Sequence, residues 1–222
     1  MLSALLRLLP LEKGTILLDG VDISAVADPD KIRSRFITLP QDPVLIGGTV
    51  RHNLHLYSYG DEGGGHPGSV NQKITDDHLI STLDSFGLWE TIHRKGGLDA
   101  NMTEDVLSHG QRQLFCLARA TLLRGRGRNV VILDEPTSQA DPETEGMIEA
   151  AVRDRFGGGD RTTVLCVAHR LSTILEFDVV LVMDAGVVVE RGNPRALLRD
   201  RASAFTALMR NQTSSVQGQG QI

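Results

Sequence analysis

The most constraining feature of the sequence is an apolar run that ends on two adjacent acids, Val130-Val-Ile-Leu-Asp-Glu-Pro136. Its first four residues are apolar and rich in β-branched side chains, which is the pattern of a central parallel strand buried on both faces. Proline cannot donate to a strand ladder, so Asp134 and Glu135 project into the crevice where open α/β sheets bind ligands. One carboxylate there can hold Mg²⁺, and the next can orient or deprotonate a water. The alternative is a buried strand that ends in a solvated acidic turn.

Length, charge and cysteine content limit the classes of protein. The 222 residues suffice for one good-sized domain or for a core with an inserted lobe. A net charge of -5 and the absence of a long basic run argue against nucleic acid as a partner. No apolar run approaches the roughly 20 residues of a membrane helix, so this chain has no membrane segment of its own. Cys116 and Cys166 lie in apolar segments, which favours reduced thiols and a cytosolic location.

The first half of the chain reads as short strands followed by helices. Met1 to Leu9 has the pattern of a helix that ends before Pro10. Strand-like pieces follow, and a strand within 32–39 ends just before Gln41. From residue 42 to about 125 helical patterns dominate, which predicts an inserted helical lobe with a Gly-rich surface loop at 60–68.

The second half continues the α/β pattern. A helix is expected at 144–156, and a second buried strand at 162–168 delivers His169. A lone histidine at a strand end is more often structural than catalytic, but it lies beside the two acids if the strands are neighbours. Residues 179–190 predict a hairpin, 194–210 are helical, and the tail at 211–222 is predicted to be disordered.

A second polar motif, Leu107-Ser-His-Gly-Gln111, stands directly before a segment with helical apolar spacing. Free backbone N–H groups and the positive end of the helix dipole suit a phosphate at such a place, and Ser108 adds a hydroxyl. The commoner meaning of a serine before a helix is an ordinary N-cap, and that interpretation stays open here.

Five motifs follow one another in a specific order, namely Leu39-Pro-Gln-Asp-Pro-Val-Leu45, Leu107-Ser-His-Gly-Gln111, Val130-Val-Ile-Leu-Asp-Glu-Pro136, Ser138-Gln-Ala-Asp141 and Val167-Ala-His-Arg-Leu171. This order resembles the nucleotide-binding domain of ATP-binding cassette transporters, to about residue 210. The amino-acid sequence of residues 32–54 is most similar to the second cassette of the C-type, multidrug-resistance-associated group. The resemblance implies an α/β, P-loop NTPase-like cassette with a mostly parallel core sheet, as one domain at 1–210 with the helical lobe at about 42–125.

The resemblance also implies ATP and Mg²⁺ as cofactors and a role for each motif. Asp134 matches the metal carboxylate, and Glu135 matches the general base. Gln41 matches the lid glutamine that contacts Mg²⁺ or the attacking water, and His169 matches the histidine that touches the γ-phosphate.

Other residues match positions at a head-to-tail dimer interface. In the family, the motif that contains Ser108, Gly110 and Gln111 binds the γ-phosphate of ATP held by a second cassette, and Asp141 belongs to the interface loop. The implied partners are that second cassette and a transmembrane domain, which would place the chain at the cytosolic face of a membrane.

The sequence departs from the family pattern in three places, one of which is Gln139-Ala140 where the family usually has Ala-Leu. His109 replaces a glycine, and such a side chain adopts a glycine-like φ less easily. No Gly-x-x-x-x-Gly-Lys followed by Ser or Thr occurs, so we expect a chain that begins inside a longer domain, with the N-terminal strands and the phosphate loop missing.

Two functions therefore stay open. The chain is an ATPase within an exporter, or it is an inactive fragment or short isoform that completes a partner cassette's ATP site. DNA-repair and chromosome-organising cassettes fit less well, because no basic tract or long heptad arm is present.

Overall fold

The computed structural model describes residues 1–55, 74–103, 105–123, 130–137, 140–157, 162–168 and 171–217. The chain divides into two compact units, Met1–Val167 and Ala168–Ile222. The Gly-rich loop expected at 60–68 lies outside the described residues.

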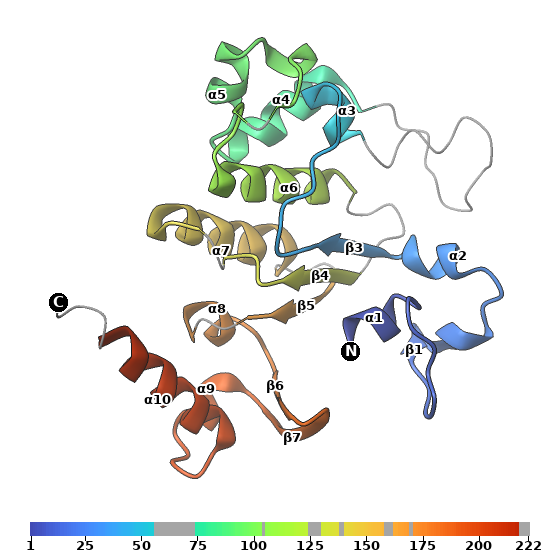
Figure 1. Ribbon diagram of the computed structural model, residues 1–222, viewed down its shortest axis with the longest axis vertical. Coiled ribbons are helices and arrows are strands. Elements are labelled where there is room, and N and C mark those ends of the chain that lie inside the picture. The colour runs from blue at the N-terminus through green and yellow to red at the C-terminus, as the bar shows by residue number, and fades with distance from the viewer. Residues whose placement is uncertain are drawn as a thin grey trace. The chain divides into compact units, whose positions relative to one another are not determined.

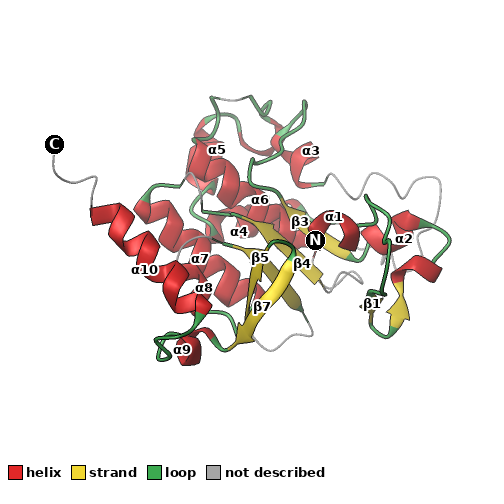
Figure 2. Ribbon diagram, turned by 60° about the horizontal axis from the view of Figure 1, so that its bottom comes forward, coloured by secondary structure: helices red, strands yellow, loops and turns green. Residues whose placement is uncertain are grey.

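A three-stranded parallel sheet forms the centre of the first unit. Its strands are β3 (Phe36–Leu39), β4 (Val130–Asp134) and β5 (Thr163–Val167), and β4 lies in the middle. Figure 2 shows them side by side in yellow. Leu133 pairs with Leu39 on one side and with Cys166 on the other, so the three carboxyl ends lie at one edge. This confirms the predicted α/β fold with a parallel sheet.

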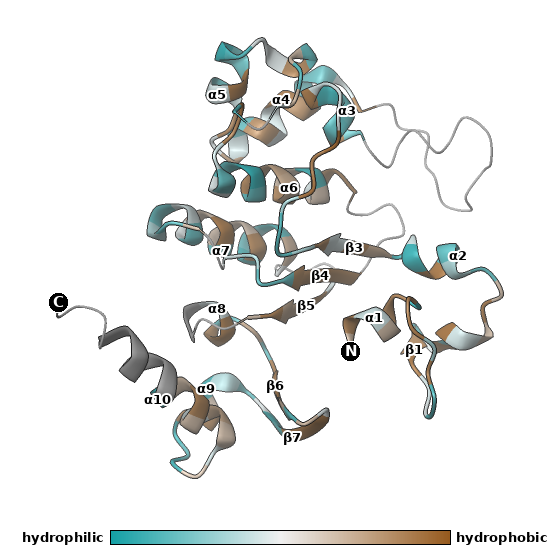
Figure 3. Cartoon of the chain, viewed as in Figure 1, coloured by the Kyte–Doolittle hydropathy of each residue, from teal (hydrophilic) through white to brown (hydrophobic). Residues whose placement is uncertain are grey.

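Strand β4 is buried on both faces, as its unbroken apolar run predicts. Val131 and Leu133 belong to a large apolar cluster with helices α6 (His109–Leu123) and α7 (Pro142–Phe156). The alternate residues Val130 and Ile132 belong to a smaller cluster with the N-terminal segment. Figure 3 colours the strands brown accordingly. Strand β5 lies at the edge of the described sheet and is only half-buried, with Thr163 exposed, where we expected a buried strand.

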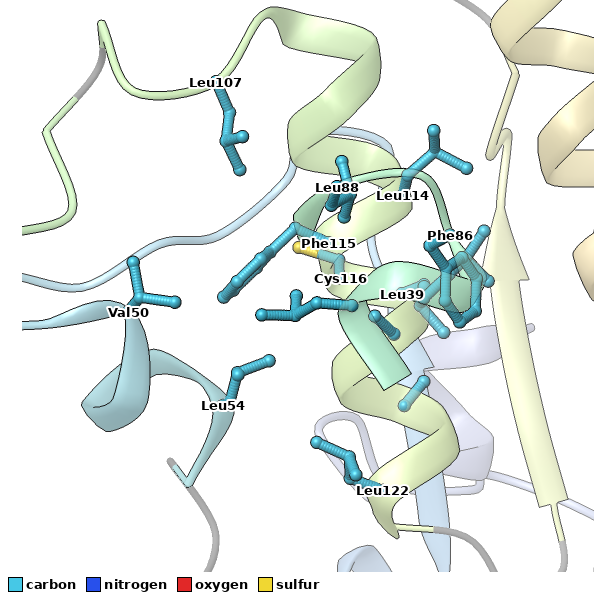
Figure 4. Packing of buried hydrophobic residues seen from close by; sticks show 14 of the residues in the cluster. Leu39, Val50, Leu54, Phe86, Leu88, Leu107, Leu114, Phe115, Cys116 and Leu122 are labelled. Atoms are coloured by element: carbon cyan, nitrogen blue, oxygen red, sulfur yellow. The ribbon is translucent and has the colours of Figure 1, made fainter. Parts of the chain in front are cut away.

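Helix α6 is the main helix on one face of the sheet. It packs against β3 and α7, and also against α3 (Val50–Leu54) and α4 (Asp76–Ser85) (Figure 1). In Figure 4, Phe115 reaches from α6 toward Val50 and Leu54, and all three side chains are buried. Helix α5 (Trp89–Arg94) and the 3-10 turn η3 (Gly97–Asp99) also lie within 42–125.

The N-terminal helix is shorter than predicted. Helix α1 spans Leu2–Leu5, whereas the leucine-rich pattern predicts a helix to Leu9. Arg7 has a φ of +52°, and the N–H of Leu8 donates to Ser3 O at 2.8 Å, which is a left-handed helix end. The Arg33 side chain donates to the carbonyls of Leu6 and Arg7, so a long-range contact satisfies the groups that a longer helix would pair.

Short elements connect this helix to the sheet. They are β1 (Leu17–Leu18), its antiparallel partner β2 (Val21–Asp22), the 3-10 turn η1 (Ile23–Ala25) and α2 (Pro29–Arg33).

The second unit contains α8 (Leu171–Leu175), β6 (Val180–Asp184), β7 (Val187–Gly192), α9 (Pro194–Leu197) and α10 (Ala204–Gln217). Strands β6 and β7 form the predicted hairpin, and its turn residues Ala185 and Gly186 both have positive φ. Glu190 accepts hydrogen bonds from Ser203 Oγ and from the N–H of Phe205, each at 2.8 Å, which ties β7 to the start of α10.

Helix α10 continues past residue 210, where the disordered tail was expected to begin. The added residues contain neither glycine nor proline before Gly218, so no strong helix breaker ends it earlier. Residues 218–222 lie outside the described part of the chain. No helix in the described part combines the length and apolar character that crossing a membrane requires.

Candidate functional site

The first part of the candidate site is the carboxyl edge of the parallel sheet. Asp134 is the last residue of β4 and is half-buried, and Glu135 follows it. Gln41 stands two residues after the end of the neighbouring strand β3 and is exposed. Parallel strands end at the same edge, so the topology brings these residues to one side of the sheet. His169, expected just after β5, lies outside the described residues.

Glu135 has an unusual backbone conformation. Its φ is +46°, in the left-handed region, and its N–H donates to Val167 O at 2.9 Å. A residue other than glycine is strained there by about 1–3 kcal/mol and persists only where its surroundings hold it. The bond to Val167 extends the pairing of β4 with β5 by one residue before Pro136 ends it. The chain therefore turns sharply at the position predicted for the base.

The second part of the site is the N-terminus of α6. The N–H of Gln111 donates to Ser108 Oγ at 3.2 Å, and the N–H of Ser108 donates to Gln111 Oε1 at 3.0 Å. This reciprocal pair is a capping box, so the N-cap interpretation of Ser108 is correct. Ser108 is exposed, and its hydroxyl keeps a hydrogen to donate while it accepts this bond.

His109 and Gly110 lie inside the helix rather than before it. Helix α6 begins at His109, and neither residue has a positive φ. The histidine therefore meets no backbone strain in place of the family's glycine. Its Nε2 atom is buried without a hydrogen-bond partner.

Gly110 lies where α6 contacts α7. A Cβ atom at this position would lie 2.7 Å from Cγ2 of Thr144, closer than Cβ contacts in proteins. The glycine is therefore required for the close approach of the two helices.

Asp141 is the N-cap of α7. Its Oδ1 accepts from the N–H groups of Glu143 at 3.1 Å and Thr144 at 2.9 Å, and its Oδ2 accepts from Thr144 Oγ1 at 2.7 Å. The N–H and then the hydroxyl of Thr144 hold the pKa of Asp141 below its ordinary value. Pro142 occupies the first helical position, where a missing N–H costs nothing.

The structure thus brings Gly110 and Asp141 together through a residue that sequence reasoning missed. Thr144 contacts both the α6 turn and the Asp141 carboxylate. The sequence Asp141-Pro-x-Thr144 is typical of a helix N-terminus, so the sequence could have predicted that a helix starts next to Thr144. No local sequence pattern predicts the contact between Thr144 and Gly110.

The donor set at the sheet edge fits Mg²⁺. Asp134 and Gln41 offer carboxylate and amide oxygens, the ligands this ion prefers. Across the described residues, no cluster of three or more His, Cys, Asp or Glu side chains is placed to hold a metal. Magnesium commonly takes one or two carboxylates and fills its other positions with water and phosphate oxygens, so a single acid suffices.

Both thiols are unsuited to chemistry. Burial raises the pKa of Cys116, whose thiol lies 3.5 Å from Arg119 Nη2. Burial, with the charge of Asp134 added, raises the pKa of Cys166 to about 12. Both cysteines are free, as predicted.

Comparison with known protein families decides the affiliation. The family model described as "ABC transporter" matches residues 1–138, which include the Gln41 loop, the capping box and the two acids. The chain belongs to the ABC transporter family.

Curated relatives agree with this assignment. The chain is 42% identical over 211 residues to "ABC transporter ecdL" of Aspergillus rugulosus, which covers 95% of this chain and 13% of that protein. It is 38% identical over 209 residues to "ABC transporter C family member 3" of Dictyostelium discoideum, covering 93% of this chain and 13% of the relative. It is 36% identical over 206 residues to "ATP-binding cassette sub-family C member 2" of Rattus norvegicus, covering 91% and 12%. The chain therefore spans only 12–13% of the length of these three relatives.

Proposed function

We propose that the chain is the ATP-binding and ATP-hydrolysing part of an exporter that moves its substrate across a membrane. The observation that carries this proposal is the pair Asp134 and Glu135 at the carboxyl end of the central parallel strand. Adjacent acids at this edge suit a metal-bound phosphate and a water that attacks it.

Each residue has a distinct part in the proposal. When bound, Mg²⁺ neutralises charge on the phosphate oxygens. Asp134 and Gln41 hold that ion, and Glu135 takes a proton from the attacking water. Glu135 stands in a left-handed turn directly after the end of the strand. His169 is proposed to contact the γ-phosphate.

The α6 terminus is proposed to bind ATP held by a second cassette. Ser108 donates its hydroxyl hydrogen, and Gly110 offers a backbone N–H at the positive end of the helix dipole. Gln111 stabilises this terminus through its bond to the N–H of Ser108. Asp141 lies beside it in the interface loop.

The group and the partners are proposed on the same basis. Relatives named as C family or sub-family C members support assignment to the C-type group. The amino-acid sequence of residues 32–54 supports assignment to the second cassette of that group. A transmembrane domain and a second cassette in a head-to-tail dimer are the partners, with this chain at the cytosolic face. The domain organisation that goes with this proposal is one domain at 1–210 with a helical lobe at about 42–125.

Glu135→Gln in the longest natural protein that contains this chain tests the proposal. The amide cannot act as a base, so we expect ATP turnover to fall about 10²–10⁴-fold with folding preserved. Glu90→Gln, an exposed substitution on α5, is the control and should leave turnover unchanged. Equal turnover in the two variants would refute the role of Glu135.

A second candidate rests on the sequence itself, which contains no Gly-Lys-Ser or Gly-Lys-Thr loop. In this case the chain hydrolyses nothing and only offers Ser108 and Gly110 to ATP on a partner cassette. The intact mass of the native protein, together with ATP turnover by the purified 222-residue chain, separates the two. A native mass near 24.1 kDa and turnover equal to that of Glu135→Gln favour this candidate.

A further inference from the structure

The first turns of α6 and α7 contact each other with no room for a methyl group. Added to Gly110, a Cβ atom would lie 2.7 Å from Thr144 Cγ2, 3.1 Å from its Oγ1 and 3.2 Å from its Cβ. Gly146, two residues after Thr144 on α7, has nothing within 4 Å of such an atom. The restriction at Gly110 therefore does not extend to this nearby glycine.

The Thr144 side chain contacts both the α6 turn and Asp141, and its methyl group is the atom closest to the Gly110 position. Its hydroxyl donates to Asp141 Oδ2 at 2.7 Å, and its N–H donates to Oδ1 at 2.9 Å, so both carboxylate oxygens are held by one residue. One side chain therefore contacts both the Asp141 carboxylate and the α6 turn.

We propose that Thr144 is a positioning residue that fixes the Asp141 carboxylate relative to the Ser108–Gly110 turn. The methyl sets the distance between the turns, and the hydroxyl sets the direction of the carboxylate. The catalytic consequence rests on the proposed function, since it assumes that these two turns form one side of a nucleotide site. Two variants separate the contributions of the methyl and the hydroxyl, because Thr144→Ser keeps the hydroxyl and Thr144→Val keeps a methyl group.

Thermal unfolding of the full chain tests the methyl. We expect Gly110→Ala to lower Tm by several degrees, although alanine ordinarily favours a helix over glycine. The matched control Gly146→Ala should raise Tm slightly. Gly110→Ala combined with Thr144→Ser should recover at least half of the loss. A Gly110→Ala variant as stable as Gly146→Ala, or a double variant with no recovery, would overturn the proposed contact.

Titration and turnover test the hydroxyl. In the full chain, the pKa of Asp141, followed by carbon-13 NMR of its carboxyl, should rise in Thr144→Val and stay unchanged in Thr144→Ser. In the longer protein, turnover should fall about fivefold in Thr144→Val with the KM for ATP little changed, and Thr144→Ser should keep most of it. An unchanged pKa, or wild-type turnover in Thr144→Val beside a dead Glu135→Gln, would overturn the positioning role. If wild type shows no hydrolysis that depends on Glu135, the proposed function fails, and the unfolding and titration results alone decide the inference.

Discussion

Helices α6 and α7 are both 15 residues long and start beside each other, yet their N-termini are built from different chemistry. The α6 start is closed by the neutral pair Ser108 and Gln111, with no acid in its first turn. The α7 start is closed by Asp141 and carries Glu143 and Glu145 in its first turn. Each cap accepts an N–H from its own helix start, but only α7 carries acids that complement its dipole.

This difference separates two uses of a helix start. Acids in the first turn stabilise a helix by complementing its positive end, and they repel any second anion there. A neutral cap stabilises the helix nearly as well and leaves the positive end available. The comparison therefore favours the α6 start over the α7 start for the proposed anion binding.

The largest expected effect is on ATP binding, when the neutral N-cap of α6 is replaced by an acidic one like that of α7. Aspartate caps a helix as well as serine, so Ser108→Asp should preserve the free energy of unfolding. Its charge should weaken ATP binding about tenfold or more, measured as the ATP concentration that half-saturates turnover. Thr75→Asp at the N-cap of α4 is the matched control. Equal binding in both variants would contradict the assignment of the α6 start.

Removing the cap of α7 should cost more stability than any change to the α6 cap. Asp141→Ala loses three hydrogen bonds and the charge that complements the dipole, so we expect a loss of about 1–2 kcal/mol in urea unfolding. Asp141→Asn should lose much less because asparagine still caps. A loss below about 0.5 kcal/mol for the alanine variant would remove the contrast between the two helices.

The N-cap of α6 should contribute less to the free energy of unfolding than the N-cap of α7. Ser108→Ala removes one acceptor at an exposed position, while Gln111 still accepts from the N–H of residue 108, so about 0.5–1 kcal/mol is expected. The same urea experiment measures it. A cost larger than that of Asp141→Ala would reverse the order.

The smallest expected effect is a loss of unfolding free energy as the pH falls below about 4. The pKa of Asp141 is lower in the folded chain than its ordinary value, because Thr144 donates to the carboxylate. This contribution is complete above the unfolded pKa of about 3.9 and is lost as the pH falls through the folded value. Below about pH 4, wild type should therefore lose unfolding free energy faster than Asp141→Asn. Parallel curves for the two proteins would contradict the direction of the shift.

The central sheet and its ligand-binding edge were predictable from the sequence of one strand and the acids that follow it. The unbroken apolar run before Asp134 predicts a strand buried on both faces, and β4 packs against one cluster on each face. Its acids then mark the edge where ligands bind. The hairpin of β6 and β7 was predictable because two β-branched runs flank a short turn that contains Gly186.

Other features depend on contacts distant in sequence and leave no local pattern. Helix α1 stops early because Arg33 binds the carbonyls of Leu6 and Arg7. The left-handed turn at Glu135 depends on pairing with Val167. Gly110 reads as part of a phosphate-binding motif, and its steric role emerges only once Thr144 is placed beside it.

The state of the two cysteines has a practical consequence for labelling. Maleimide and related reagents attack the thiolate, and the raised pKa of both thiols keeps the buried Cys116 and the half-buried Cys166 protonated at neutral pH. A cysteine introduced at an exposed position, such as Asp77 on α4, should therefore react alone. Spectroscopic probes can be attached to the natural sequence without first removing its own thiols.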